Sequence, residues 1–241
     1  MEIRKLSLKQ GAEQARGTTV IIDVFRAFTC EPLMFHLGAQ EVILEGDVDR
    51  CKALRDVGGG ILVGEVNEVP IPGFDLTNSP YLILQKGRSF FEGKTVIHRT
   101  TSGVTGALTA MKHSSEVWLG SFLTAKAIAD HIRQSRPEVV SLVAMGIRSA
   151  APAPEDEACA DYIESLLTGK PFDWVERVAD ILGNETAQKF LRGDRPDLPK
   201  EDVALCLQRD LFDFALRARA GEGRVFADRI GDSGLFPSRP Q

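Results

Sequence analysis

Short apolar runs of strand length alternate with helix-length segments along the first two-thirds of this chain, and this alternation constrains the fold more than any other feature. The runs are nearly continuous in apolar residues and rich in β-branched ones, which is typical of buried strands. Strands that take turns with helices predict an α/β protein, layered α/β/α around a mixed or mostly parallel sheet. The predicted strands are Thr19–Val24, Glu41–Leu44, Ile61–Gly64, Thr95–His98, Val117–Leu119 and Val139–Met145.

Helices are predicted between these runs and again after the last of them. Asp47 or Asp49 is a suitable N-cap for the second helix. From Pro171 onward the pattern predicts a mainly helical C-terminal third, with Asp202–Arg219 as its clearest amphipathic segment and Ser233–Gln241 as an irregular tail. The predicted helices before that point are Leu33–Leu37, Cys51–Val57, Ala107–Met111, Lys126–Ile132 and Asp156–Leu167.

One segment, Glu65–Pro80, interrupts the alternation. Its 16 residues include three prolines and a glycine, too many for a helix or a central strand. It also carries an aromatic residue, three carboxylates, two asparagines and a serine. Because long loops in folded domains are usually functional, we expect an ordered loop with a role at a site.

The length of 241 residues fits one large domain or two small ones. The sequence contains no internal repeat and no break in composition that forces a division. We therefore expect a single domain over residues 1–241, with a subdivision near residue 170 as the alternative.

The charge balance excludes several classes of partner. Lys and Arg number 29 and Asp and Glu 34, a net charge of −5, so no overall basic field is available to hold nucleic acid or an anionic membrane.

The longest apolar stretches stop well short of the ~20 residues that a membrane span needs. The N-terminal segment lacks the apolar core of a signal peptide, and we expect a cytoplasmic protein.

The four cysteines lie far apart in the sequence, and none belongs to a CxxC pair. This spacing argues against a zinc site and against a disulfide framework. We expect buried thiols in a reducing compartment. The cysteines are Cys30, Cys51, Cys159 and Cys206.

Polar side chains follow two of the predicted strands, at the end where open α/β sheets collect their ligands. Asp23 ends the first apolar run, and Arg26 follows three residues later. A buried Asp is costly unless it is paired or bound to a metal, and an Asp–Arg ion pair is the structural alternative to a catalytic role. Glu65 follows Gly64, whose missing Cβ lets another backbone approach closely, although a solvated loop Glu gives the same pattern.

Two further segments offer groups that bind anions. The long loop brings Asn78 and Ser79, which can donate hydrogen bonds, although both are also good turn formers before a proline. After the strand Thr95–His98, hydroxyl groups and glycines precede a helix, where free backbone N–H groups and the helix dipole favour an anion. An ordinary N-cap is the alternative there. The candidate residues of this second loop are Thr100, Thr101, Ser102 and Gly103.

Carboxylates beside anion-binding groups point to a hard cation such as Mg2+, which bridges protein oxygens to phosphate. An acidic pair, Glu155–Asp156, also starts a helix after the last predicted strand, where carboxylates are often only partners of the helix dipole. The candidate ligands for the cation are Asp23, Glu65, Asp75 and Asp156.

The chain lacks the sequence patterns of several familiar enzyme classes. It has no P-loop of the NTPases, no glycine pattern of dinucleotide-binding proteins and no nucleophile elbow of the α/β-hydrolases. Asp23-Val24-Phe25 lacks the second Asp of the aspartyl-phosphate phosphatases. Cys30 is followed by His36 at the position where cysteine phosphatases place an Arg.

Five segments, in order and at the expected rough spacing, resemble the 2-phosphosulfolactate phosphatase (ComB) family, and a later stretch, Asp202–Asp210, resembles its C-terminal pattern. The similarity covers about nine-tenths of the chain. The segments are Ile21–Ala27, Gly64-Glu65, Gly73–Pro80, Thr100–Gly103 and Glu155-Asp156.

The resemblance implies a Mg2+-dependent acid phosphatase acting on a small phosphorylated acid, with 2-phosphosulfolactate as the best single candidate. In that reading Asp23, Arg26 and Glu65 are catalytic, and Asp23 either attacks phosphorus or activates water. The substrate would also contact Asn78, Ser79 and the loop 100–103. A homodimer is the default expectation for the oligomeric state.

The chain departs from the family pattern at Thr77 and, within the two segments assigned to substrate contact, at Phe28, Cys30, Ser102 and Val104. These departures motivate an alternative, a non-catalytic family member that binds a small anionic metabolite. A nucleotide-binding α/β protein is a third reading, without any of the usual phosphate-loop patterns to support it.

Overall fold

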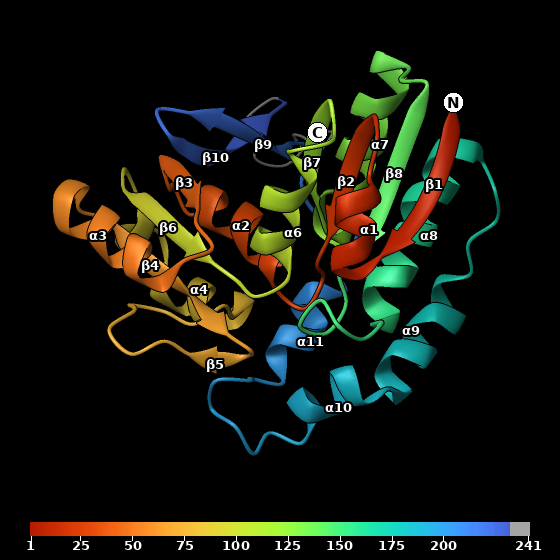
Figure 1. The fold of residues 1–241 in the computed structure, drawn as a ribbon. Helices are drawn as coiled ribbons and strands as arrows, with labels where there is room; N and C mark the ends of the chain where they lie inside the picture. Colours follow the sequence, from red (N-terminus) through yellow and green to blue (C-terminus); the bar gives the residue numbers. More distant parts are fainter. Residues whose placement is uncertain (232–241) are drawn as a thin grey trace, which may run out of the picture.

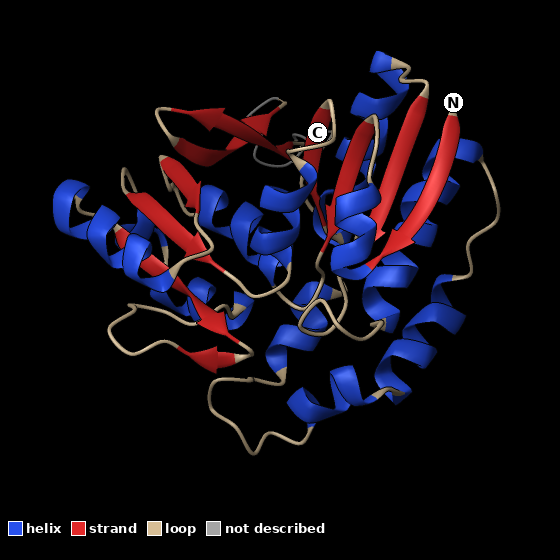
Figure 2. Ribbon diagram, in the orientation of Figure 1, coloured by secondary structure: helices blue, strands red, loops and turns tan. Residues whose placement is uncertain are grey.

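The computed structural model describes residues 1–231 and shows an α/β protein built on a sheet of ten strands. The strand order across the sheet is β1-β8-β2-β7-β9-β10-β3-β6-β4-β5 (Figures 1 and 2). The strands are β1 (Glu2–Ser7), β2 (Thr18–Ile22), β3 (Glu41–Leu44), β4 (Ile61–Val66), β5 (Val69–Pro70), β6 (Thr95–Arg99), β7 (Glu116–Gly120), β8 (Val139–Ala144), β9 (Ala215–Gly221) and β10 (Arg224–Ile230).

Helices cover both faces of this sheet. They are α1 (Leu8–Gln14), α2 (Ala27–His36), α3 (Val48–Gly58), α4 (Pro80–Lys86), α5 (Arg88–Phe91), α6 (Gly103–Ala110), α7 (Ala125–Ser135), α8 (Pro154–Thr168), α9 (Trp174–Gly183), α10 (Glu185–Leu191) and α11 (Glu201–Cys206), with a 3-10 turn, η1, at Phe122–Thr124.

Strand β2 shows how the layers form. Its five residues are all buried, and successive side chains point to opposite faces. Ile21 packs into the apolar cluster that includes residues of α1, α2 and α6, while Val20 and Ile22 pack into the cluster that includes residues of α7 and α8. A strand covered on both sides in this way reads as a continuous apolar run, which is why the sequence predicted it.

The sheet consists of two parallel groups joined by an antiparallel hairpin. One group is β1, β8, β2 and β7, and the other is β3, β6 and β4. The hairpin β9–β10 pairs with β7 on one side and with β3 on the other, both times antiparallel. In a flat sheet these three antiparallel pairings would send the carboxyl ends of the two groups to opposite edges. The sheet is instead strongly twisted, and the two groups turn toward one another below the hairpin (Figure 1).

All six strands predicted from apolar runs are confirmed as β2, β3, β4, β6, β7 and β8, with boundaries within two residues. The five predicted helices are also present. Of the two N-cap candidates for α3, the structure uses Asp47, whose carboxylate accepts a hydrogen bond from the Arg50 backbone N–H at 2.9 Å. Helix α2 begins at Ala27, several residues earlier than predicted.

The C-terminal third is not purely helical, and the prediction of one amphipathic helix over Asp202–Arg219 is wrong. Helix α11 ends at Cys206, and Ala215–Gly221 forms a strand inside the sheet. Ala, Leu and Arg favour helices intrinsically, but pairing with strands on both sides outweighs that local preference. The predicted irregular tail, Ser233–Gln241, lies outside the described residues.

The N-terminal strand β1 was also not predicted, because it is a partly exposed edge strand without a continuous apolar run. The loop predicted over Glu65–Pro80 is mostly irregular, although β4 extends to Val66 and pairs there with the short strand β5. Within residues 1–231, no helix is long and apolar enough to cross a membrane.

Candidate active site

A pocket lies where β2, β4, β6 and β8 end. Segments from both halves of the sheet therefore meet at one place, as the sequence predicted from the polar residues that follow the strands. The residues that line the pocket are Asp23, Phe25, Arg26, Glu65, Glu68, Asn78, Thr101, Ser102, Gly146, Ile147, Arg148, Glu155, Asp156 and Lys189.

Asp23 lies at the floor of this pocket and is 6% exposed. Its Oδ1 accepts a hydrogen bond from the backbone N–H of Ala27 at 3.1 Å, in the first turn of α2. The pKa of Asp23 is raised to about 6: burial is the main cause, hydrogen bonds from the backbone N–H groups of Ala27 and Gly103 oppose it, and the negative charge of Glu65 adds to it. A side chain at Gly103 would collide with Asp23, since an added Cβ would lie 2.9 Å from Oδ2.

Glu65 lies beside Asp23 and is held by donors from two loops. Its Oε1 accepts from the backbone N–H of Thr101 at 2.6 Å, and its Oε2 accepts from the Thr101 hydroxyl at 3.0 Å and from the backbone N–H of Glu68 at 2.5 Å. Gly64 permits this arrangement, because an added Cβ would lie 2.1 Å from the carbonyl oxygen of Arg99. The close backbone approach predicted at this glycine is confirmed.

The acidic pair at the start of α8 completes the floor. Asp156 is 3% exposed and accepts from the backbone N–H groups of Val24 at 2.7 Å and Gly146 at 2.8 Å. Burial and the charges of Glu155 and Asp23 raise its pKa well above the usual value. Burial likewise raises the pKa of Glu155 to about 7, and its Oε2 is buried without a hydrogen-bond partner among the described residues.

The loop 100–103 does not present its predicted set of free anion donors. The Thr100 hydroxyl accepts from the backbone N–H of Val104 in the first turn of α6 at 2.9 Å, and Thr100 does not line the pocket. Thr101 gives its N–H to Glu65. Ser102 lines the pocket, and its hydroxyl donates to the Gly146 carbonyl at 3.1 Å. Thr101 therefore orients a carboxylate of the chain itself, and Ser102 holds the loop at Gly146.

Arg26 is buried in the pocket wall but is not paired with Asp23. Its Nη1 donates to Asp202 at 2.8 Å and to the carbonyl of Asp197 at 3.0 Å, and its guanidinium lies over the ring of Phe190. The ion pair between Asp23 and Arg26 that the sequence offered as the structural alternative is therefore wrong, because Arg26 pairs with Asp202 of α11. Asp202 is 1% exposed.

Ser79 also contacts Asp202, and it does not line the pocket. Its hydroxyl donates to Asp202 at 2.8 Å and caps α4 by accepting from the backbone N–H of Leu82. The backbone N–H of Tyr81 also donates to Asp202, at 2.9 Å. The sequence signal for Asp202 was its place in the C-terminal stretch that resembles the family, but the stretch gave no indication of its role.

Asn78 lines the pocket and is held in place by a buried chain of hydrogen bonds. Its Oδ1 accepts from Nε2 of His98 at 3.0 Å, and Nδ1 of His98 lies 2.8 Å from Oε1 of Glu31. His98 and Glu31 are fully buried. Since the amide oxygen faces His98, the amide N–H groups of Asn78 are the ones that face away from it, and Asn78 lines the pocket.

Asp75 is the predicted metal ligand that the structure leaves outside the pocket. It is exposed, and its Oδ2 accepts from the backbone N–H of Leu62 at 2.8 Å, which fixes the loop against β4. The pocket thus brings together seven of the predicted site residues and leaves out four. The seven are Asp23, Arg26, Glu65, Asn78, Thr101, Ser102 and Asp156, and the four are Asp75, Ser79, Thr100 and Gly103.

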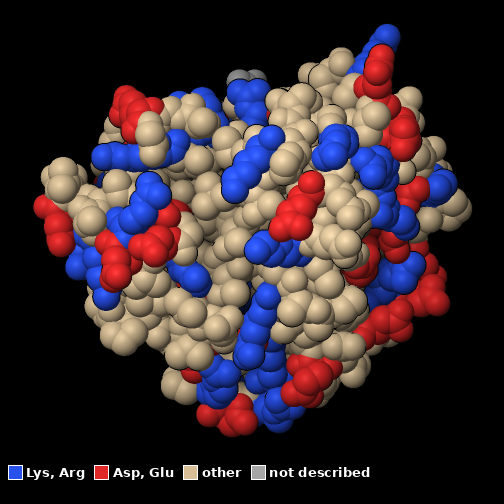
Figure 3. Space-filling view, in the orientation of Figure 1, with Lys and Arg blue, Asp and Glu red and all other residues tan. Residues whose placement is uncertain are grey.

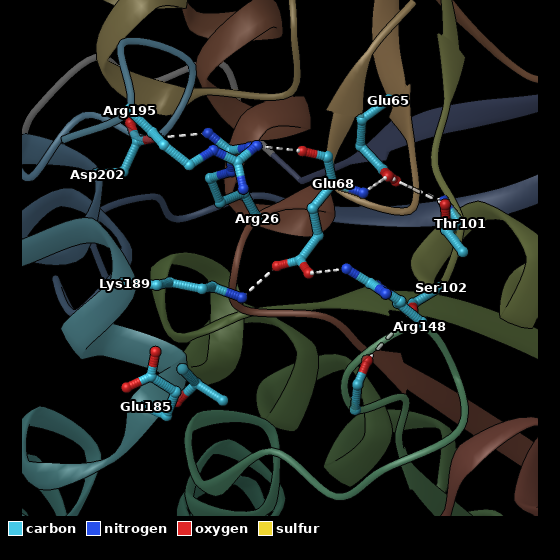
Figure 4. A network of polar contacts seen from close by, with 12 residues as sticks. Arg26, Glu65, Glu68, Thr101, Ser102, Arg148, Glu185, Lys189, Arg195 and Asp202 are labelled. Carbon is cyan, nitrogen blue, oxygen red and sulfur yellow. Dashed lines mark hydrogen bonds and ion pairs between the residues drawn. The ribbon is translucent and has the colours of Figure 1, made fainter. Parts of the chain in front are cut away.

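The mouth of the pocket carries charged residues that sequence reasoning missed. Glu68 pairs with Lys189 of α10 and, at 3.3 Å, with Nη2 of Arg148 (Figure 4). Arg195 donates to the backbone carbonyl of Glu68 at 3.1 Å. Basic and acidic side chains are interspersed over the visible face of the molecule, including the region of α10 and the loop after it (Figure 3).

Three of the four departures within the segments assigned to substrate contact lie in the core. Phe28, Cys30 and Val104 are fully buried in the apolar cluster that includes residues of α1, α2 and α6, and none of them lines the pocket. Only Ser102 reaches it. The expectation that all four lie at substrate contacts is therefore not met.

Comparison with known proteins bears directly on this pocket. A sequence model of a family described as 2-phosphosulpholactate phosphatase matches residues 5–220. The chain belongs to the 2-phosphosulfolactate phosphatase family. The match includes every residue that lines the pocket, from Asp23 to Lys189.

Individual members of the 2-phosphosulfolactate phosphatase family are similar over most of their length. A probable 2-phosphosulfolactate phosphatase of Bacillus subtilis is 32% identical over 204 residues, 83% of this chain and 86% of the relative. One from Clostridium perfringens is 29% identical over 219 residues, covering 84% of this chain and 86% of the relative. One from Synechocystis is 28% identical over 211 residues, which cover 80% of this chain and 86% of the relative.

Proposed function

We propose that this protein is a Mg2+-dependent phosphatase that hydrolyses a small phosphorylated hydroxy acid, with 2-phosphosulfolactate as the best candidate. The observation that carries the proposal is the meeting of Asp23, Glu65 and Asp156 with Arg26 in one pocket of a chain from this family. The relatives from Bacillus subtilis and Clostridium perfringens are described as probable 2-phosphosulfolactate phosphatases.

The floor of the pocket fits a divalent cation by charge. Asp23 and Glu65 repel one another, and Asp23 in turn raises the pKa of Glu155 and Asp156. Glu155 also keeps a buried oxygen without a partner among the described residues. A cation beside Asp23 would relieve this repulsion.

The geometry also limits how a cation can be held. Within residues 1–231, no three His, Cys, Asp or Glu side chains are grouped closely enough to hold a metal ion on their own. Mg2+ usually takes one or two carboxylates and completes its shell with water and substrate phosphate. Asp23 with Asp156 or Glu155 is the set that fits. When bound, Mg2+ supplies positive charge to the phosphoryl oxygens.

The residues of the chain carry the remaining steps. Arg26 lines the pocket and donates to Asp202 and Asp197 through Nη1, which leaves Nε and Nη2 to donate to a phosphoryl oxygen of the substrate. Asn78 offers its amide N–H groups, which His98 orients toward the same space. These donors stabilise charge as the bond from phosphorus to the ester oxygen breaks.

Asp23 is the group assigned to the attack on phosphorus. It either accepts the proton of an attacking water or attacks phosphorus itself and is then released by water. In both routes the departing ester oxygen takes a proton from water, and the products are the hydroxy acid and phosphate. Acid quenching with 32P-labelled substrate separates the routes, since only direct attack leaves label on the protein.

The non-catalytic alternative rested on Cys30, Ser102 and Val104. Cys30 and Val104 pack in the core outside the pocket, and Ser102 is the one of the three that lines it. The alternative therefore rests on a single pocket residue.

A screen of phosphate release from phosphorylated hydroxy acids tests the proposal, with Mg2+ and with EDTA. We expect release from 2-phosphosulfolactate that depends on Mg2+ and stops with EDTA. Binding of these esters without any release, in the presence of Mg2+, would favour the non-catalytic alternative.

A further inference from the structure

The hairpin that joins β4 to β5 has a two-residue turn with an unusual conformation. Val66 pairs with Val69, and the residues between them, Asn67 and Glu68, have φ values of 50° and 66°. Such a turn favours Asn at its first position and Gly at its second, because both residues need positive φ. Glu at the second position is unfavourable for the backbone, which directs attention to what its side chain does.

The Glu68 carboxylate lies between two cations from distant parts of the chain. Oε1 pairs with Nζ of Lys189, and Oε2 lies 3.3 Å from Nη2 of Arg148 (Figure 4). Arg148 also has positive φ, 51°, in the loop after β8. Two turns in unfavourable conformations therefore present opposite charges to one another across the mouth of the pocket.

These contacts are of a kind that a ligand can exchange. The backbone of Glu68 is held independently, since its N–H donates to Glu65 and its carbonyl accepts from Arg195. The side chain can therefore leave the cations while the turn stays in place. The side chains of Glu68 and Arg148 are 25% and 54% exposed, so water and solutes reach the pair.

Without Glu68, both cations would need another anion. Among the described residues, Arg148 and Lys189 form no other ion pair at contact distance. Both line the same pocket as Asp23, and Lys189 lies close enough to Glu155 to lower its pKa. The two cations therefore border the space that a substrate at the floor would occupy.

We propose that Arg148 and Lys189 form a subsite for a second acid group of the substrate, a carboxylate or sulfonate near the phosphate ester, and that Glu68 fills this subsite until substrate displaces it. The inference rests on the proposed phosphatase function and adds to it the residues that select acidic esters. A guanidinium and an ammonium together suit a carboxylate or sulfonate, which each can bind by charge-assisted hydrogen bonds. Binding then replaces one carboxylate by another acid group, without leaving either cation unpaired.

Two esters that differ in one group provide the test. 2-Phospholactate carries a carboxylate where isopropyl phosphate carries a methyl group, and both have the same secondary phosphate ester. We expect R148Q and K189Q each to raise KM for 2-phospholactate about tenfold, the loss expected for a charge-assisted hydrogen bond, with KM for isopropyl phosphate unchanged. E68Q removes the competing charge and is expected to lower KM for 2-phospholactate about threefold, also without effect on isopropyl phosphate. Phosphoisethionate compared with ethyl phosphate applies the same test to a sulfonate.

Glu185 provides a matched control on α10. It pairs with Arg192 on the surface and does not line the pocket, so E185Q should leave both KM values unchanged. Thermal unfolding of each variant identifies any that fail to fold. R148Q remains available if K189Q fails, because Arg148 is the more exposed of the two.

Equal changes in KM for the two esters would overturn the subsite, because they would show a general effect on the pocket. A rise in KM with E68Q would likewise show that Glu68 supports binding rather than competing with it. If neither ester releases phosphate, calorimetric binding of 2-phospholactate and isopropyl phosphate to the same variants still tests the subsite. The phosphatase proposal fails separately, if 2-phosphosulfolactate and the other phosphorylated hydroxy acids of the screen release no phosphate with Mg2+.

Discussion

The floor and the mouth of the pocket are both charged, but they are held in different ways. At the floor, the carboxylates of Asp23, Glu65 and Asp156 accept hydrogen bonds mainly from backbone N–H groups. At the mouth, Glu68 is held by the side chains of Lys189 and Arg148. Backbone donors are fixed once the fold forms, whereas ion pairs between half-exposed side chains exchange with solutes. The floor is therefore suited to chemistry at a fixed geometry, and the mouth to selecting what enters.

The largest expected effect is at the floor. Asp23→Asn keeps the shape of the side chain and removes the charge, so kcat should fall about 10³-fold, the range expected for losing a catalytic acid–base group. Initial rates of phosphate release, with circular dichroism as a check on folding, measure it. Unchanged turnover in this variant would remove Asp23 from the mechanism and leave the floor without its proposed role.

The buried ion pair between Arg26 and Asp202 should contribute more to stability than the exposed ion pairs. Asp202→Ala leaves the buried guanidinium of Arg26 without its charged partner and should lower the free energy of unfolding by about 3 kcal/mol. Denaturant unfolding measures this change. Glu185→Ala, which breaks an exposed pair on α10, is the control and should have little effect. A similar small change for both would show that the buried pair is replaceable.

The floor should also make the metal-free protein sensitive to pH. Because the pKa values of Asp23 and Glu155 are raised to about 6 and about 7 in the folded state, the folded protein binds more protons than the unfolded chain. The stabilisation is present at low pH and is lost as pH rises through these values, and we expect Tm with EDTA to fall by about 5 °C between about pH 5 and about pH 8.

Added Mg2+ should oppose this loss, since it compensates the charge of the ionised carboxylates. It should raise Tm more at the higher pH than at the lower. A Tm that rises with pH in EDTA, or the same Mg2+ effect at both pH values, would contradict the account of the floor.

The smallest expected effect concerns salt and separates the two regions. Raising NaCl from about 0.05 M to about 0.5 M should screen the exposed charges of the mouth and raise KM for 2-phospholactate about threefold. The buried donors of the floor are screened much less, so kcat should stay constant. A fall in kcat with no change in KM would reverse the assignment of the two regions.

The same contrast explains what the sequence could predict. Asp23, Glu65 and Asp156 follow or flank continuous apolar strands, so their place at the strand ends could be inferred from pattern alone. The strongly twisted sheet that joins the two halves depends on the hairpin β9–β10, and β9 has the local composition of a helix. Their pairing with β7 and β3 is a tertiary effect that local propensity does not contain.

The mouth could not be inferred in this way, because its contacts link residues with no local relation. Glu68 and Lys189 are 121 positions apart, and Glu68 and Arg148 are 80 apart. Glu68 also looks like an ordinary loop carboxylate in sequence, and only the positive φ of its turn distinguishes it. Asp75 shows the converse, since it lies in the loop predicted to carry site residues, but its carboxylate bonds to the backbone of Leu62 outside the pocket.

A crystal structure of the Asp23→Asn protein with Mg2+ and 2-phosphosulfolactate tests the account of this pocket most directly. We predict the cation and the phosphoryl group at the floor, an acid group of the substrate on Arg148 and Lys189, and the side chain of Glu68 moved away from both. A ligand bound elsewhere on the protein would contradict the active site. A ligand at the floor with Glu68 still paired to both cations would contradict the division between floor and mouth.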